Sequence, residues 1–402
     1  MKKSELLSLI SYSLENVKIF DIHTHLFPPE HKNFFLMGID ELLNYHYLIA
    51  ELFVTSDINV KKFNSLTKKE KAEIVWNELF VKRTPISEAC KGILTILKNF
   101  SITFENKNYS EVKAQLNKIE YKDDNIFKKS NITSVVMTNN PFDLDEWSLF
   151  NNPNWDRKKY RASLRLDNLI NEFDKSLNIA QKSISSKSNT PSDIIEYLEV
   201  CRNESNPIYV ALSLDNASFK NLLISDFWFN VLEWLSEKKL PMSLMLGVKR
   251  RVNKDFGEAG DGIGDIELKD LSKLCSTFPN NKFLVTCLSL NDQHELTVLG
   301  RKHPNLKIFG FWWFMNQPSI IKPVLKMRID LLGLAFIAQH SDARITDQLI
   351  YKWSHFKKIL SSTLHEYYED LLDNNFLITK DIIQRDVDKL LNSNAKDFLS
   401  VD

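Results

Sequence analysis

The sequence is short of the residues that build flexible linkers, disulfide frameworks and cysteine-ligated metal sites. Its 402 residues include only 10 glycines and 12 prolines, so long flexible linkers are not expected. The four cysteines (Cys90, Cys201, Cys275 and Cys287) are far apart and form no C-x-x-C pair. This spacing is typical of reduced, partly buried thiols in a cytoplasmic protein.

An excess of charge of one sign is also missing. Lys and Arg together number 52, Asp and Glu together also number 52, and the formal net charge is zero. No basic excess can therefore neutralise a nucleic-acid backbone. No apolar run reaches the roughly 18 residues that a membrane span requires. We expect a cytoplasmic protein that binds neither nucleic acid nor a membrane.

The chain does contain the material for a large core, with 43% hydrophobic and 11% aromatic residues. Short β-branched and aromatic runs alternate with stretches of helical periodicity. The runs cover residues 18–25, 132–139, 161–167, 208–215, 241–247, 282–289, 305–313 and 333–340. Such apolar runs fit strands that are covered on both faces. Eight strand–helix units predict an α/β fold, a (β/α)8 TIM-type barrel.

Two segments depart from this alternation. The first two predicted strands are separated by roughly a hundred residues, whereas a βα loop usually has about 2–6. Helical patterns in this gap predict a helical insertion over residues 30–130, above the mouth of the pocket. The tail, residues 354–402, predicts two or three helices outside the barrel. We expect residues 1–402 to form one barrel that includes both segments.

The strongest chemical signal is the sequence Asp-Ile-His-Thr-His at residues 21–25, where the first predicted strand ends. Alternate residues of a strand point to the same side, so His23 and His25 project together. At the C-terminal end of a barrel strand, both imidazoles can reach one metal ion. The structural alternative is a pair of hydrogen-bonded histidines without a metal.

Asp342 follows the last predicted strand, which is the neighbour of the first strand in a closed barrel. It can complete the metal shell or act as a base or proton shuttle, and the alternative is a helix N-cap. None of the nine histidines lies between His46 and His294, so the third to fifth strands offer no imidazole. We therefore expect one divalent ion, with zinc as the first expectation, bound by His23, His25 and Asp342.

A series of short segments, in order across nearly the whole chain, forms a recognisable set. They are DIHTHLFPPE (21–30), ELLNYHY (41–47), LRLD (164–167), GDGIGD (260–265), FWWFMNQ (311–317), SDAR (341–344) and NAKDF (394–398). The set resembles the motifs of the uronate (glucuronate) isomerase family, a branch of the amidohydrolase superfamily, and the chain is similar to a divergent member. The resemblance implies a metal-dependent barrel and aldose–ketose isomerisation of a hexuronate or related sugar acid, within carbohydrate metabolism.

The resemblance also implies site residues. His46 and Tyr47 match the His and Tyr of the family's LL-x-DHY segment, and Arg165 and Arg344 match arginines of its F-R-P-D and TDSR segments. A planar guanidinium suits bidentate contact with a substrate carboxylate, although a structural ion pair is the alternative. His46 can move a proton and Tyr47 can polarise a carbonyl, or both can simply pack on a helix face.

Two further positions bear on the pocket. Trp312 and Trp313 end the seventh predicted strand, where one can stack on a sugar face, with core packing as the alternative. The fifth strand carries Met245 where the family has the histidine of QLHIG. A thioether neither shuttles protons nor binds a hard divalent ion well.

Three functions stay open at this point. The first is a uronate isomerase-like enzyme that takes a small-molecule sugar acid. The second is a mononuclear metal-dependent hydrolase or lyase in which Asp342 activates a water, and the third is a catalytically degenerate binding protein. The paired arginines and the His46–Tyr47 pair favour the first. A homo-oligomer is left open.

Overall fold

The computed structural model describes residues 3–103, 105, 108–119, 122–152, 154–186, 188 and 190–402. Parallel strands in two hydrogen-bonded groups form its centre. The first group is β1 (Ile19–Asp21), β2 (Ile132–Val136) and β3 (Tyr160–Arg161). The second group, in spatial order, is β10 (Leu306–Ile308), β9 (Phe283–Cys287), β6 (Met242–Leu246), β5 (Val210–Leu214) and β4 (Leu164–Arg165).

Isolated bridges join the two groups. Asn139, just after β2, pairs in parallel with Leu164 of β4. Because β3 and β4 follow each other within six residues, they act as one strand that contacts both groups. At the other edge Phe309, just after β10, pairs in parallel with Ile337. The segment around Ile337 is therefore the eighth strand position of the ring.

This eighth segment closes the ring against the first strand. The main-chain N–H of Asp342 donates to the carbonyl of His23 at 3.0 Å, and the N–H of His25 donates to the carbonyl of Ala343 at 2.7 Å. The predicted α/β barrel of the TIM type is thereby confirmed. All residues of β6 and β9 are buried, as expected for strands between a filled barrel interior and a layer of helices.

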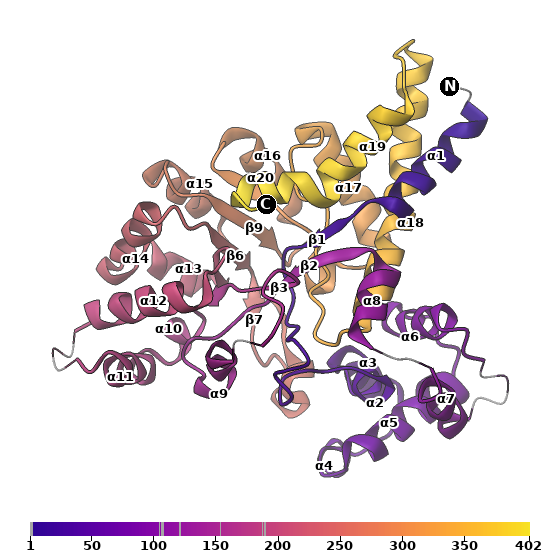
Figure 1. Cartoon of the computed structure of the whole chain (residues 1–402), viewed down its shortest axis with the longest axis horizontal. Coiled ribbons are helices and arrows are strands. Elements are labelled where there is room, and N and C mark those ends of the chain that lie inside the picture. Colours follow the sequence, from indigo (N-terminus) through magenta and orange to yellow (C-terminus); the bar gives the residue numbers. More distant parts are fainter. Residues whose placement is uncertain are drawn as a thin grey trace.

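Helices cover the outside of the strands (Figure 1). They are α10 (Asn168–Asn171), α11 (Phe173–Ile184), α12 (Ser192–Ser205), α13 (Asn216–Leu222), α14 (Asp226–Glu237), α15 (Leu268–Thr277), α16 (Gln293–Lys302) and α17 (Pro318–Leu332). Shorter elements lie in the connections: α9 (Leu144–Trp147), η2 (Ser148–Asn151), β7 (Val248–Lys249), η3 (Lys254–Gly260), β8 (Gly262–Ile263) and η4 (Trp313–Met315). The Asp215 carboxylate caps α13 by accepting the N–H of Ser218.

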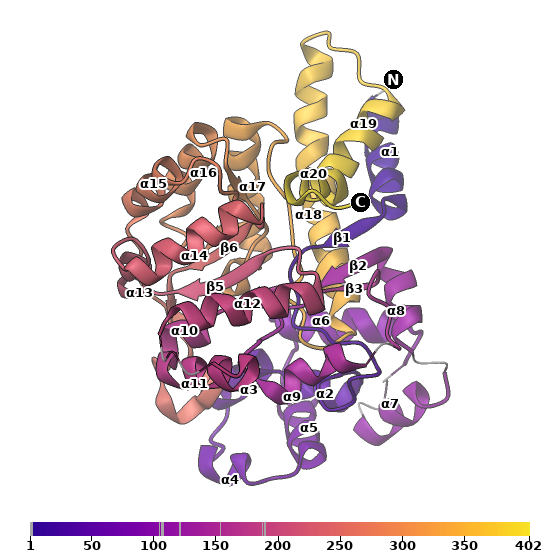
Figure 2. The same cartoon turned by 60° about the vertical axis from the view of Figure 1, so that its left-hand side comes forward.

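The long connection between β1 and β2 is helical. It contains α2 (Ile39–Leu43), α3 (His46–Thr55), α4 (Val60–Asn64), α5 (Lys68–Trp76), the π-helix η1 (Asn77–Val81), α6 (Glu88–Asn99), α7 (Tyr109–Leu116) and α8 (Asp123–Ser130). Figures 1 and 2 show α2 to α5 together on the side of β1 to β3 opposite α19 (Lys380–Asp388) and α20 (Asn394–Leu399). The boundaries 30–130 stay a prediction, but helices do occupy the expected stretch.

The C-terminal region consists of α18 (Gln348–Asp373), α19 (Lys380–Asp388), the π-helix η5 (Lys389–Ser393) and α20 (Asn394–Leu399). The helix α18 begins six residues before the predicted boundary at 354, because its buried first turns are part of the core. The N-terminal helix α1 (Lys3–Asn16) packs against α18 and α19. Within the described part of the chain, no helix has the length and apolar character needed to cross a bilayer.

A buried carboxylate joins α18 to the ring. Asp21 ends β1, and its carboxylate accepts hydrogen bonds from the Ser341 N–H at 3.0 Å and from Trp353 Nε1 at 2.9 Å. Burial raises the pKa of Asp21 to about 6, and these hydrogen bonds oppose that shift. The first strand, the eighth segment and α18 therefore meet at one side chain.

We expect Trp353→Phe to lower the free energy of unfolding by about 1–3 kcal/mol, because it leaves a buried acceptor of Asp21 without a donor. The matched control is Trp234→Phe, which removes the same donor from Glu199, whose side chain is 30% exposed and can be hydrated. Urea unfolding of both variants measures the difference. Equal losses in the two variants would refute a special role for the Asp21 junction.

Candidate metal centre and its cavity

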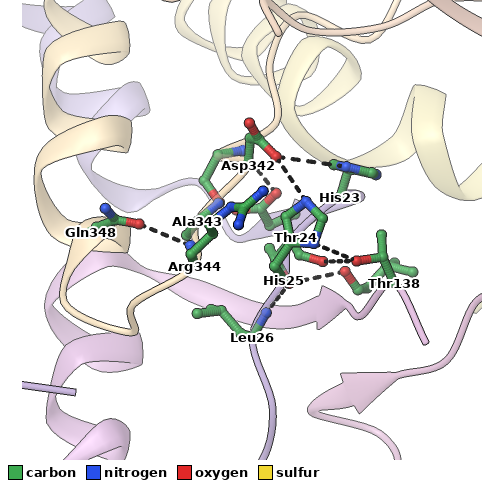
Figure 3. Close-up of polar contacts among 12 residues, drawn as sticks. His23, Thr24, His25, Leu26, Thr138, Asp342, Ala343, Arg344 and Gln348 are labelled. Atoms are coloured by element: carbon green, nitrogen blue, oxygen red, sulfur yellow. Dashed lines mark hydrogen bonds and ion pairs between the residues drawn. The ribbon is translucent and has the colours of Figure 1, made fainter. Parts of the chain in front are cut away.

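The candidate metal centre lies where the first strand meets the eighth segment. His23 and His25 follow β1, and Asp342 lies opposite them across the closing hydrogen bonds (Figure 3). Asp342 has a backbone φ of +50°, in the left-handed region that residues other than glycine rarely adopt. Such a backbone conformation persists where the surrounding structure enforces it, and it is common at functional sites.

The three side chains converge through one ligand atom each. Oδ1 of Asp342 is 3.7 Å from Nε2 of His23 and 3.3 Å from Nε2 of His25. One ligand atom from each residue lies within 4.8 Å of the others. His23 is 2% exposed and Asp342 is 8% exposed, whereas the side chain of His25 is 22% exposed, so the group can be approached on the His25 side. The prediction that the side chains of these three residues lie close together is therefore confirmed.

Hydrogen bonds determine the tautomer of His23. The Tyr209 hydroxyl donates its single proton to the carbonyl of Ile22 at 2.7 Å. Its oxygen, 3.3 Å from Nδ1 of His23, can therefore only accept from that nitrogen. This assigns the proton of His23 to Nδ1 and leaves a lone pair on Nε2, the atom that faces Asp342.

Hydrogen bonds also determine the tautomer of His25. The Thr138 hydroxyl donates to the carbonyl of Thr24 at 3.2 Å and lies 2.8 Å from Nδ1 of His25. It therefore accepts the Nδ1 proton, and Nε2 of His25 also presents a lone pair toward Asp342. Figure 3 shows Thr138 on the far side of the His25 ring from Asp342.

The charge states agree with this assignment. Burial lowers the pKa of His23 to about 3 and that of His25 to about 4, so both imidazoles are neutral at pH 7. Burial alone would raise the pKa of Asp342, but nearby positive charge, including that of Lys352, outweighs burial and holds that pKa below its usual range. Oδ1 of Asp342 is buried without a hydrogen-bond partner.

Two nitrogen lone pairs and one carboxylate oxygen thus face one another with no proton between them. A cation removes the repulsion among these acceptors, and two imidazoles with one carboxylate form a common zinc-type donor set. The residues present therefore fit one divalent metal ion. No other such group of His, Cys, Asp or Glu is found in the part of the chain that the structure describes.

The metal centre forms part of the wall of a cavity. The other lining residues are His46, Thr138, Arg165, Asp167, Ala211, Ser213, Met245, Arg250, Trp312, Trp313 and Arg344. All but one of the predicted site residues are therefore brought together here, and Tyr47 is the exception. Met245, at the position of the family histidine, is buried in this wall and supplies no nitrogen ligand.

Three arginines face the cavity, each beside an acidic residue. Arg165 NH2 lies 3.8 Å from Glu146 Oε2, and Arg344 NH1 lies 3.3 Å from Glu258 Oε2. Arg250 is absent from the predicted set. It lies between β7 and β8, and its NH1 is 2.6 Å from Asp261 Oδ2. Guanidinium groups oriented in this way can bind a substrate carboxylate.

His46 and Tyr47 start α3 and point to different places. The His46 ring lies 6.1 Å from that of Trp313, and burial lowers its pKa to about 3. Tyr47 packs 4.7 Å from the ring of Tyr45 and lines a second cavity, which it shares with His46 and Trp313. His46 thus lines both cavities, including the one beside the candidate metal centre, whereas Tyr47 lines only the second cavity.

Sequence reasoning did not identify several residues of the site. Thr138 and Tyr209 orient the two histidines, and Asp167, which lines the cavity, accepts the N–H of Ser213 at 2.7 Å. Asp167 had a signal, since it belongs to the LRLD segment. Thr138 is the second-last residue of the second predicted strand run and Tyr209 is the second residue of the fourth, and neither position alone indicates a histidine partner.

Comparison with known proteins gives one strong similarity. No protein-family model matches the chain, and no curated protein sequence matches it. The structure of a uronate isomerase from Bacillus halodurans is 36% identical, with a TM-score of 0.95 over 100% of this chain and 98% of that chain.

Two more distant structures share the fold. A uronate isomerase from Thermotoga maritima is 14% identical over 98% of this chain and 97% of that one. A glucuronate isomerase from Caulobacter crescentus is 13% identical over 99% of this chain and 94% of that one. Each has a TM-score of 0.79.

We expect Thr138→Val to weaken binding of a divalent ion about 10–100-fold, because His25 loses the acceptor that orients its ring. Thr133→Val is the matched control, since this exposed threonine of β2 donates only to the carbonyl of Ile19. Competition with a chromogenic chelator measures the affinity. Equal affinities in the two variants would contradict the assigned role of Thr138.

Proposed function

The chain belongs to the uronate isomerase family, and from that membership we propose how its own residues carry out the aldose–ketose isomerisation of a hexuronate or related sugar acid. The observation that carries the proposal is the enclosure of the His–His–Asp centre and three arginines in one cavity. Family membership favours the isomerase over the hydrolase or lyase that the sequence left open.

The reaction sets two requirements on the site. A uronate carries a carboxylate at one end and an aldehyde carbonyl at the other. Isomerisation moves a proton from the carbon beside the carbonyl to the carbonyl carbon, and the hydroxyl proton of that neighbouring carbon moves to the carbonyl oxygen. The site must hold the carboxylate and must supply a group that accepts and returns the proton. Nothing is oxidised or hydrolysed overall.

The arginines meet the first requirement. Arg165 ends β4, Arg250 lies between β7 and β8, and Arg344 follows the eighth segment, so their charges converge on one cavity from several directions. Their acidic neighbours orient the guanidinium groups, and the planar groups can form paired hydrogen bonds with a carboxylate and with hydroxyls. Trp312 and Trp313 supply apolar surface for a sugar face.

Asp342 meets the second requirement. Its carboxylate is ionised at neutral pH because its pKa lies below the usual range. Oδ1 faces the two histidines and would bind the metal ion, which leaves Oδ2 as the proton acceptor. It can therefore accept a proton from a substrate carbon or hydroxyl and return it to the neighbouring position. His46, neutral in the same wall, is a second group that can relay a proton. Tyr47 would act on the substrate only through His46.

His23, His25 and Asp342 would hold the metal ion, for which we propose zinc because of the two imidazole nitrogens. When bound, the ion would polarise a substrate oxygen and stabilise the negative charge that develops there. We further propose that the protein works in the cytoplasm, in carbohydrate metabolism, on a small sugar acid rather than on nucleic acid or a membrane. The balance of charge supports this, and a homo-oligomer is compatible with it.

We expect the zinc-loaded protein to convert at least one hexuronate of a stereochemical panel from aldose to ketose, as followed by NMR. Chelation should abolish conversion, and zinc should restore it. His25→Ala and Asp342→Asn should each lower kcat/KM by about 100-fold or more. His303→Ala is the control, because His303 lies on the outer helix layer, bonded to Ser272. Water-dependent cleavage of a lactone or amide without any isomerisation would reject the proposal.

We expect Arg250→Gln to lower kcat/KM for the same hexuronate about 10–100-fold through the loss of one charged hydrogen-bond donor. The matched control is Arg251→Gln, because Arg251 is exposed and does not line the cavity. Comparison with the corresponding neutral sugar separates the roles, since only carboxylate-bearing substrates should be affected. An equal effect of Arg250→Gln on both substrates would show that Arg250 acts only structurally.

A further inference from the structure

A third cavity, of about 350 Å³, lies at the end of the barrel opposite the metal centre. Residues that precede strands or begin them form its walls: 160–162, 207–208 before β5 and 240–241 before β6. The tail after α20 contributes residues 399–401. Active sites of such barrels lie at the C-terminal ends of the strands, so this basal cavity is separate from the catalytic one.

The basal cavity is strongly basic. The described residues that line it include five cationic side chains and no acidic one. The five are Arg157, Arg161, Arg202, Lys238 and Lys239. In a chain of zero net charge, this concentration creates a local positive potential that attracts anions into the concavity.

Two of these cations have a structural explanation. Arg202 NH2 and Lys238 Nζ lie 2.8 and 3.2 Å from the same carboxylate oxygen of Glu199. They also lie at the C-terminal ends of α12 and α14, where the helix dipole favours positive charge. These two residues alone would not indicate a ligand.

The other three cations have no carboxylate partner, although Arg157 lies 5.0 Å from the Trp155 ring and Arg161 lies 5.7 Å from the Phe20 ring. Across the described residues, no ion pair involves Arg157, Arg161 or Lys239, and the two arginines belong to no helix. Arg157 NH1 donates to the carbonyl of Glu204 at 2.8 Å, and Arg161 NH2 donates to the main-chain oxygen of Asp402 at 3.2 Å. Both contacts leave most of the donors of each guanidinium available.

Two buried donors in the same wall also lack acceptors. Nε of Arg161 and Nε1 of Trp155 are buried, and neither has a hydrogen-bond partner. Buried donors are nearly always paired in folded proteins, so each such exception requires an explanation. The guanidinium and ammonium groups that line the cavity are donors only, so an oxyanion with several acceptor oxygens matches them, whereas a cation or an apolar ligand does not.

We propose that the basal cavity binds a small molecule that carries a phosphate group. The two negative charges of a phosphate match the cations that lack a carboxylate partner, and its oxygens match the fork of a guanidinium. The volume lies at the lower end of the range for small-ligand cavities, and Trp155 and Tyr160 offer an aromatic wall. The ligand differs from the proposed substrate, which carries one carboxylate and binds at the other end of the barrel.

Isothermal titration calorimetry with inorganic phosphate and, separately, with a sugar phosphate tests the proposal at constant ionic strength. We expect binding to the native protein and at least about tenfold weaker binding to the double variant Arg157→Gln/Lys239→Gln. Both side chains are exposed, so this variant should fold and keep its isomerase activity. Binding of the sugar phosphate alone would identify a phosphate ester as the ligand, and binding of both would identify the phosphate group itself.

Two controls locate the binding. Lys158→Gln removes a neighbouring exposed charge that does not line the basal cavity, and Arg344→Gln removes a charge from the catalytic cavity. Both should bind phosphate as the native protein does. The proposal is overturned if neither ligand binds, if the double variant binds as tightly as the native protein, or if Arg344→Gln abolishes binding.

Discussion

The seam between the first strand and the eighth segment is the constraint on which the rest of the structure depends. The main-chain bonds from Asp342 to His23 and from His25 to Ala343 complete the ring, and the residues that form them also carry the metal ligands. The ligand distances are thus determined by the closure of the barrel. Asp21 reinforces this junction, because its buried carboxylate accepts donors from the eighth segment and from α18.

The features that sequence reasoning predicted correctly depend on local periodicity. The alternation of apolar runs with helical stretches requires only the pattern of neighbouring residues, and it gave the barrel. The two-residue period of a strand placed His23 and His25 on one side, and the closure rule for a barrel added Asp342. The family motifs brought in Arg165 and Arg344, which do line the cavity, because motif residues sit where strands end.

The features that could not be predicted depend on contacts between distant segments. Arg250 is one of three consecutive basic residues, and only the short β7–β8 pair determines that it is the one over the cavity. His46 and Tyr47 are neighbours in sequence, but successive helical residues point about 100° apart, so only His46 faces the cavity beside the candidate metal centre. The grouping of five cations around the basal cavity could not be predicted either, because these residues come from three separate parts of the chain.

The position of the seam has a consequence for how the molecule is made. Asp21 and Ser341 are 320 residues apart, so the two sides of the metal centre are synthesised at widely separated times. A growing polypeptide on the ribosome carries both imidazoles long before the acid that completes their coordination sphere exists. Contacts across such a separation form late in folding, since the intervening chain must first be ordered. A polypeptide terminated before Asp342 would therefore lack both the seam and one of the three residues of the metal centre.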